Sequence, residues 1–451
     1  MGHDLLIYNA LLLTLEPESR PWYQGYVAIQ GSKIAAVGQA SGIQNLPNAT
    51  EYWNAGGSLV MPGLVNTHCH AAMTLFRGLA DDLPLEQWLH QHIFPGESRW
   101  VDYDFVYTGA LLAAAEMIRG GVTTVADAYF WEAGARQAFA EAGLRAVTAQ
   151  GVIDFPAPGV PDGSDNLAVA REFIESGRRS PDGLITSTLF CHAPYTCSAG
   201  TLQGAKALTR SHNLPFFIHL AETRQEADQI RHQTGLSPTA YLDSLGLLDE
   251  KTVAVHAVWV DETDRQLLAR RGVKISHCPE SNLKLAAGVA PVAELIQEGA
   301  IVGLGTDGAA SNNNLDLWGE MSLAAKIHKV VRQDPTVLPA RQVVEMATRQ
   351  GAQVLGLEDV TGSLAPGKDA DLIVLELRQP HLTPMYDPFS HLVYTARAVD
   401  VQQVMVQGRW LMRHRELLTL DWQILREKVR GWAGKIMPGA AGFFQGMADQ
   451  A

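Results

Sequence analysis

Histidine and aspartate residues recur in this sequence at the ends of short aliphatic runs. Runs of this kind are typical of buried strands, and each polar residue stands at or next to the point where its run ends. Seven residues share this placement: His68, His70, His192, His219, His256, His277 and Asp307. A single strand histidine usually fills a core position, but seven polar residues in equivalent places indicate one site.

His68 and His70 are separated by Cys69. Successive side chains of a strand point to opposite faces, so the two imidazoles are predicted to project together while the Cys69 thiol points away. Imidazole nitrogen suits a borderline metal ion such as zinc. Together with His219 and Asp307, the pair offers three nitrogens and one carboxylate, with room for a water molecule. The sequence therefore predicts a metal site formed by these four residues.

An alternation of strands and helices would bring these residues together. Eight strands are predicted, at Val60–Thr67, Val122–Asp127, Arg145–Ile153, Leu184–His192, Pro215–Leu220, Thr252–His256, Val273–His277 and Ile301–Asp307. Helix-like segments follow most of them, such as Asp104–Arg119 and Glu262–Arg271. This pattern predicts an α/β fold, a closed (β/α)8 barrel of the TIM type, whose active site lies at the C-terminal strand ends. An open doubly wound sheet is the alternative, but no glycine-rich dinucleotide turn supports it.

The two ends of the chain read differently, as short strands without intervening helices. Such segments occur at Asp4–Leu15 and Gly25–Val37, and again at Asp371–Leu377 and Gln402–Met412. Chain termini often lie close together, so we predict one small β-sandwich domain built from both ends. The predicted division is residues 1–58 for its N-terminal part, 59–366 for the barrel, 367–421 for its C-terminal part, and 422–451 for a helix and tail.

Composition limits the remaining possibilities. The chain has 451 residues, 47% of them hydrophobic, and a formal charge of −13, which argues against nucleic acid or anionic membrane as a partner. Its four cysteines include no CxxC pair, so a disulfide framework is not expected. The N-terminus lacks the basic region of a signal peptide, and no stretch reaches the roughly 18 apolar residues of a membrane span. We therefore expect a cytoplasmic protein.

Several motifs resemble the amidohydrolase superfamily across essentially the whole chain. They are Val65-Asn66-Thr67-His68-Cys69-His70, His219-Leu220-Ala221-Glu222, Ser276-His277-Cys278-Pro279, Gly305-Thr306-Asp307-Gly308 and the segment from Gly362 to Leu372. A narrower resemblance is to the 5′-methylthioadenosine/S-adenosylhomocysteine deaminases. It is carried by Arg77 to Leu89, His192-Ala193-Pro194-Tyr195 and Ser281-Asn282-Leu283-Lys284-Leu285. Triazine hydrolases share much of the same pattern.

The resemblance implies hydrolytic deamination of the adenine C6 amine of 5′-methylthioadenosine and S-adenosylhomocysteine, with adenosine as a further candidate. The products would be the inosyl compound and ammonia. Two-metal members of the superfamily use a carboxylated lysine on the fourth strand, and Leu184–His192 contains no lysine. We therefore expect one divalent metal ion per chain, with zinc favoured. The resemblance also suggests a homo-oligomer.

Three residues are expected to carry the chemistry. Asp307 can both bind the metal and accept a proton from water, and His256 is placed to steady the developing oxyanion. Glu222 could protonate a ring nitrogen and then pass a proton to the leaving amine. Glu222 and Asp307 would therefore also touch the substrate.

Further substrate contacts follow mainly from the resemblance. Glu97 matches the residue that holds the ribose hydroxyls, although by itself it reads as a surface charge. His192 is expected to contact substrate, and Trp88 offers a flat apolar face for the base or a thioether. Ser311 matches a hydroxyl near the site, and His277 is expected to be structural or to support a ligand.

Two alternatives remain open. Another amidohydrolase reaction on an aromatic nitrogen heterocycle, such as guanine- or pterin-type deamination or triazine dechlorination, would use the same scaffold. Glu97 discriminates here, since a free base or a triazine has no ribose to hold. A non-enzymatic relative would be marked by missing metal ligands, and all four are present.

Overall fold

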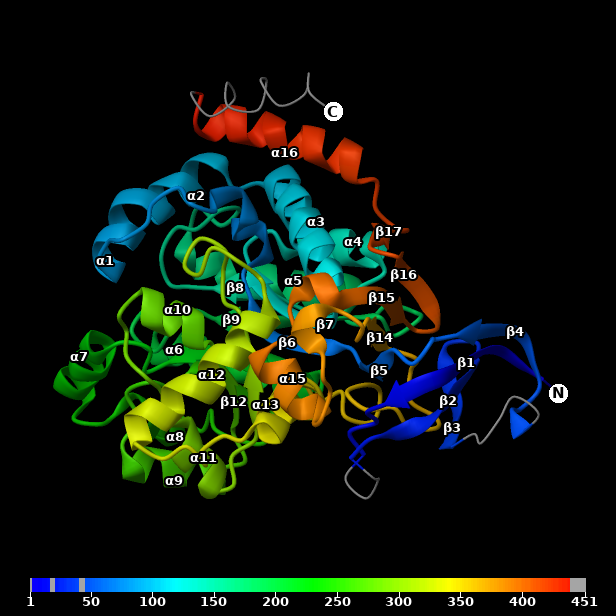
Figure 1. The fold of residues 1–451 in the computed structure, drawn as a ribbon. Coiled ribbons are helices and arrows are strands. Elements are labelled where there is room, and N and C mark those ends of the chain that lie inside the picture. Colours follow the sequence, from blue (N-terminus) through cyan, green and yellow to red (C-terminus); the bar gives the residue numbers. More distant parts are fainter. Residues whose placement is uncertain (1, 17–20, 40–44, 439–451) are drawn as a thin grey trace.

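A computed structural model describes residues 2–16, 21–39 and 45–438 (Figure 1). Eight parallel strands form one sheet in chain order: β6 (Leu64–Cys69), β7 (Val122–Tyr129), β8 (Arg145–Val152), β9 (Ile185–Cys191), β10 (Phe216–Leu220), β11 (Thr252–His256), β12 (Lys274–His277) and β13 (Val302–Leu304). The backbone N–H groups of Thr306 and Asp307 both donate to the His68 carbonyl, at 3.1 Å each, and so join the last strand to the first. The predicted barrel is confirmed.

Helices surround this barrel and connect its strands (Figure 1). Those that follow the strands are α3 (Tyr103–Gly120), α4 (Glu132–Ala142), α5 (Asn166–Gly177), α6 (Ala199–Ser211), α7 (Arg224–Thr234), α8 (Pro238–Ser244), α9 (Glu262–Arg270), α10 (Pro279–Lys284), α11 (Val292–Gln297), α12 (Leu317–Arg332), α13 (Ala340–Met346) and α14 (Arg349–Val354). Within the described ranges, no helix combines the length and the apolar character that a membrane crossing requires.

The second sheet draws strands from both ends of the chain, as predicted (Figure 1). Its nine strands are β1 (His3–Leu12), β2 (Tyr23–Gln30), β3 (Lys33–Gln39), β4 (Ala49–Asn54), β5 (Leu59–Pro62), β14 (Leu372–Leu375), β15 (Val401–Val406), β16 (Arg409–Arg413) and β17 (Glu416–Leu417). The junction between the two ends is β5, which pairs with β1 on one side and β14 on the other. The predicted domain boundaries stay a prediction.

Three strand predictions were wrong in their limits, and one of them, Gln402–Met412, is a hairpin of β15 and β16. Val60–Thr67 is not one strand, because the chain leaves the small sheet at Pro62 and enters the barrel at Leu64. At Gly63 a Cβ atom would lie 2.1 Å from the Thr123 side chain, so only glycine fits this crossing. Gly25–Val37 is a hairpin of β2 and β3, which turns at Gly31 with a φ of 58°.

The remaining helices lie between β6 and α3 or after β14 in the chain. The segment after β6 contains α1 (Leu85–Trp88) and α2 (Phe94–Trp100), while α15 (Pro388–Tyr394) packs beside α12 and α13. The C-terminal helix α16 (Trp422–Ile436) runs along α3, where the Trp432 ring meets Phe105 edge-on at 5.3 Å (Figure 1). This helix lies within the predicted segment 422–451, and the predicted tail lies outside the described residues beyond 438.

Candidate active site

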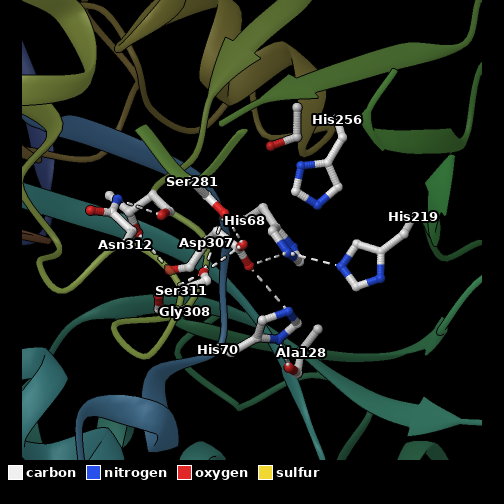
Figure 2. A network of polar contacts seen from close by, with 12 residues as sticks. His68, His70, Ala128, His219, His256, Ser281, Asp307, Gly308, Ser311 and Asn312 are labelled. Carbon is white, nitrogen blue, oxygen red and sulfur yellow. Dashed lines mark hydrogen bonds and ion pairs between the residues drawn. The ribbon is translucent and has the colours of Figure 1, made fainter. Parts of the chain in front are cut away.

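The four predicted metal ligands converge at the C-terminal ends of the barrel strands (Figure 2). His68 and His70 come from the end of β6, His219 from β10, and Asp307 from the loop after β13. The Asp307 Oδ1 atom lies 3.4 Å from His68 Nε2 and 3.3 Å from His70 Nε2. His219 Nε2 lies 3.3 Å from His68 Nε2. The two histidines of the His-Cys-His motif do project together, and Cys69 is buried outside the cluster.

The protonation of this cluster suits a divalent cation. Burial lowers the pKa of His68 to about 3, although its contact with Asp307 opposes the shift. Burial and the neighbouring imidazoles hold the pKa of His219 well below its usual value. Burial disfavours the Asp307 carboxylate, but the hydrogen bond with His68 and the nearby imidazoles keep its pKa low. Neutral imidazoles and an ionised carboxylate are the forms that bind metal.

Two contacts orient these side chains toward one point. His70 Nδ1 lies 2.5 Å from the Ala128 carbonyl, so Nδ1 carries the proton and Nε2 presents its lone pair. The Nε2 atoms of His68 and His219 lie 3.3 Å apart, and burial keeps both imidazoles neutral near neutral pH. A neutral imidazole has one ring nitrogen with a free lone pair, so both Nε2 atoms can bind a cation placed between them. The residues present therefore fit a metal ion.

Two serine hydroxyls hold the other oxygen of Asp307 (Figure 2). Ser281 Oγ, from α10, donates to Oδ2 at 2.6 Å, and Ser311 Oγ donates to the same atom at 2.8 Å. Oδ1 is thereby left to face His68 and His70. Ser311 lies beside the site as predicted by resemblance, whereas sequence reasoning gave Ser281 no role.

Glu222 lies next to the cluster without belonging to it. Its Oε2 atom is 3.8 Å from His256 Nε2, and His256 Nδ1 is 2.9 Å from Asn282 Oδ1. Burial raises the pKa of Glu222, and the neighbouring His256 opposes that shift. A buried carboxyl group beside an imidazole in a cavity is a candidate for proton transfer.

Glu226 fixes the turn that carries Glu222, and sequence reasoning missed it. Its carboxylate accepts the backbone N–H of Ala221 at 2.8 Å and that of Glu222 at 2.9 Å. Thr223 caps α7 by accepting the Glu226 N–H at 3.1 Å. The signal was present, because Thr223-x-x-Glu226 has the spacing of a capping box.

Two adjoining cavities open onto this cluster. The smaller, of about 70 Å³, is lined by Glu222, His256, Asp307, Ser311 and Trp88 among others. The larger, of about 600 Å³, contains Glu97. Both are bordered by His70, His192 and His219, so a ligand could extend from one into the other past the cluster.

Glu97 is buried, contrary to the surface charge that its position alone suggested. It lies on α2 with 6% of its surface exposed, and the Tyr129 hydroxyl donates to its Oε1 atom at 2.6 Å. Burial raises its pKa to about 7, although the Tyr129 hydrogen bond favours the ionised form. A carboxyl group held inside a cavity in this way can accept hydrogen bonds from a bound ligand.

Of the other predicted residues, His192 lies near the cluster and His277 lies away from it. The His192 ring lies 5.3 Å from that of His219, its Nδ1 is 2.9 Å from Thr196 Oγ1, and burial lowers its pKa to about 4. His277 lies apart, with its Nε2 3.3 Å from His328 Nε2 on α12. Its place at a strand end therefore does not bring it to the cluster.

A (β/α)8 barrel with imidazoles and a carboxylate gathered at its C-terminal face defines a class of metal-binding barrel enzyme. The sequence profile of the Amidohydrolase family matches residues 59–411, and this chain belongs to that family.

Relatives with similar sequences are named as nucleoside deaminases. The chain is 47% identical over 435 residues to the 5-methylthioadenosine/S-adenosylhomocysteine deaminase of Syntrophobacter fumaroxidans, covering 96% of this chain and 99% of that protein. It is 44% identical over 413 residues to the 5′-deoxyadenosine deaminase of Methanothermobacter thermautotrophicus, covering 92% and 95%.

Solved structures share the fold. An adenosine deaminase from Xanthomonas campestris with bound zinc superimposes with a TM-score of 0.93 at 36% identity, covering 97% of this chain and 99% of that one. A triazine hydrolase variant superimposes with a TM-score of 0.88 at 23% identity, covering 95% and 99%, a likeness that concerns the fold alone.

Proposed function

We propose that this protein hydrolytically deaminates adenosine-type nucleosides at C6, with 5′-methylthioadenosine and S-adenosylhomocysteine as candidate substrates and adenosine as a further one. The products are the inosyl compound and ammonia. The sequence relatives named above support this reaction class. The observation that carries it is Glu97, a buried carboxyl group in a cavity that adjoins the histidine and aspartate cluster. A free base or a triazine would bring no ribose hydroxyl to this group, whose partner in the structure is the Tyr129 hydroxyl.

One divalent metal ion, with zinc favoured, would be held by His68, His70, His219 and Asp307. When bound, it would lower the pKa of water from about 15.7 toward ~7. Elemental analysis of purified protein is expected to give about one metal per chain. Two equivalents in a fully active sample would contradict a single-metal site.

The chain's own residues move the protons. Asp307 accepts the proton of the attacking water, and His256 hydrogen-bonds that water and the oxyanion that develops. Glu222 protonates the ring nitrogen, takes up the remaining proton of the hydroxyl added at C6, and passes it to the leaving amine. The proton that Asp307 accepted then returns Glu222 to its protonated form. The contact between Glu222 and His256, 3.8 Å apart, supports this division, because both face the cavity that also contains Asp307.

The remaining contacts position the nucleoside. Trp88 provides a flat apolar wall for the base in the smaller cavity, and His192 contacts the substrate where the two cavities meet. Glu97 accepts hydrogen bonds from the ribose hydroxyls. We also propose that the protein is a cytoplasmic homo-oligomer that binds neither nucleic acid nor membrane.

Ammonia release across a panel of substrates tests the reaction. The panel includes 5′-methylthioadenosine, S-adenosylhomocysteine, adenosine, free adenine, guanine, a pterin and a chlorinated triazine. We expect ammonia from the nucleosides and little from the free bases. Turnover confined to a free base, or chloride release from the triazine, would favour another amidohydrolase reaction.

A further inference from the structure

The larger cavity is where the 5′ substituent of a nucleoside substrate would lie. Glu97 lies inside this cavity, and the catalytic Glu222, His256 and Asp307 line the smaller one. If Glu97 holds the ribose, the base extends toward Glu222 and the 5′ substituent occupies the rest of the larger cavity. This step rests on the proposed function.

The wall of the cavity away from the cluster is apolar. Phe94 on α2 and Phe155 in the loop after β8 approach edge-on, with ring centroids 6.4 Å apart. The neighbouring lining residues on that loop are Ile153, Pro156, Ala157, Pro158 and Pro161. A thioether or methyl group can pack against such a wall without losing a hydrogen bond.

The loop after β8 is held in a defined shape. Ala157 and Val160 exchange two backbone hydrogen bonds of 2.9 Å, and prolines at 156, 158 and 161 restrict the chain around them. One acidic residue of this loop, Asp154, is exposed and accepts the Ser198 N–H at 2.5 Å and the Thr201 hydroxyl at 2.7 Å. The apolar wall is thus preorganised, and the Asp154 carboxylate is already paired.

Neither cavity has a cationic side chain in its wall. Among the residues that the structure describes, no lysine or arginine lines either one. Arg99, two residues after Glu97, is exposed, and its guanidinium lies 4.5 Å over the Trp100 ring. A ligand carboxylate would therefore meet no partner of opposite charge, and the charged group it would meet is Glu97. Moving an unpaired charge from water to such a wall is costly.

We infer that the Phe94–Phe155 wall makes this site selective for nucleosides with a small, uncharged, apolar 5′ substituent, and disfavours those with an amino acid there. Of the two candidate substrates, 5′-methylthioadenosine fits this chemistry. S-Adenosylhomocysteine carries an ammonium and a carboxylate on the same thioether position.

Steady-state ammonia release by the metal-loaded wild-type enzyme tests the selectivity. We expect kcat/KM for 5′-methylthioadenosine to exceed that for S-adenosylhomocysteine by about tenfold or more, mainly through KM, because the 5′ group is remote from the reacting atoms. A 5′-butylthio analogue separates length from charge, since it is long and uncharged. We expect it to remain close to 5′-methylthioadenosine.

A matched pair of variants locates the effect. Phe155 is 38% exposed, so Phe155→Arg can place a cation at the wall without disturbing a packed core. We expect Phe155→Arg to raise the ratio of S-adenosylhomocysteine to 5′-methylthioadenosine kcat/KM by about tenfold, as expected for a hydrogen bond to a charged group. Phe155→Leu, the control, should leave that ratio unchanged.

Equal use of both nucleosides by the wild type would overturn the inference, as would an unchanged ratio in Phe155→Arg. Poor turnover of the butylthio analogue would also overturn it, because length and not charge would then be limiting. Failure of the proposed function would look different, since no nucleoside in the series would release ammonia.

Discussion

Asp307 uses its two carboxylate oxygens for different purposes. Oδ2 accepts the hydroxyls of Ser281 and Ser311, and Oδ1 faces His68 and His70. A carboxylate fixed from behind cannot rotate away, so its free oxygen stays aimed at the cluster. Glu97 has the same arrangement, because Tyr129 holds one of its oxygens. These supporting contacts make the site rigid before any ligand arrives.

The role of Glu222 can be separated from metal binding by Glu222→Gln. The amide keeps the shape of the side chain but cannot exchange a proton, and positioned acid–base groups contribute about 10²–10⁴-fold to rate. We expect kcat to fall by this order while the metal content stays that of the wild type. Near-normal kcat would assign the proton transfer to another group, with His256 as the next candidate.

The proposed role of Glu97 predicts an effect that depends on the sugar and not on the purine. Because a hydrogen bond to a charged group is worth roughly 1.5–3 kcal/mol, Glu97→Ala should lower kcat/KM for 5′-methylthioadenosine by about 10- to 100-fold. A 2′,3′-dideoxy analogue should be affected hardly at all. The wild type and Glu97→Ala, each measured with both substrates, form a thermodynamic cycle. Its coupling term isolates the contact between Glu97 and the ribose hydroxyls. Equal losses on the two substrates would leave Glu97 with a role only in shaping α2.

The sequence predicted the cluster residues but few of their supports. His68, His70, His219 and Asp307 follow from strand ends, because parallel strands of a barrel all finish on one face. Ser281 lies 26 residues from Asp307, and Tyr129 lies 32 residues from Glu97. Such contacts depend on how loops distant in the sequence fold back over the barrel. They therefore produce no periodic pattern that the sequence could reveal. The burial of Glu97 has the same cause, so only the family resemblance singled it out.

At the scale of elements, the start of α7 positions a reactive group. Ala221 adopts a φ of 49°, and Glu226 satisfies the N–H groups of Ala221 and Glu222 at this sharp turn. Glu222, which directly follows Ala221, lines the cavity that also contains Asp307. Helix capping and placement of Glu222 are thus performed by one short segment.

Two variants of this cap separate stability from placement. Thr223→Ala removes the bond to the Glu226 N–H and should cost about 1 kcal/mol of stability with kcat nearly unchanged. Glu226→Ala removes both bonds to the turn and should lower kcat by about tenfold or more, since small misplacements of reacting groups are costly. Thermal denaturation and ammonia release measure the two effects. If both variants lowered kcat equally, Glu226 would act on helix stability alone.

At the scale of the whole molecule, a buried arginine joins the barrel to the second sheet. Arg145, at the start of β8, is 1% exposed. Its Nε donates to Asp371 Oδ2 at 2.8 Å and its Nη2 to Asp369 Oδ2 at 2.6 Å. Both acids precede β14, within the Gly362–Leu372 motif. The sequence predicted a sheet built from both chain ends, but it gave no reason for this Asp-x-Asp pattern, which the contact with Arg145 now explains.

Removing this arginine should destabilise the protein far more than removing an exposed partner of the same acid. Arg145→Met would leave the buried Asp371 carboxylate without a cation and Asp369 with only the exposed Lys33, at a cost of about 3–5 kcal/mol. The matched control is Lys33→Met, because Lys33 Nζ lies 2.7 Å from Asp369 Oδ1 but its side chain is 50% exposed, so about 0–1 kcal/mol is expected. Thermal denaturation of both variants measures the difference.

A third variant decides why Arg145→Met loses stability. The cause is either the carboxylates left without a cation or the missing hydrogen bonds between the barrel and the second sheet. Combining Arg145→Met with Asp369→Asn and Asp371→Asn removes the buried charges of the network and leaves only the exposed Lys33, so unpaired carboxylates can no longer contribute. If charge is the cause, the triple variant should recover most of the melting temperature lost by Arg145→Met, since neutral replacements of buried ion pairs are often tolerated. If the triple variant melts as low as the single one, the guanidinium itself holds the two sheets together, and its five donors are needed where Met offers none.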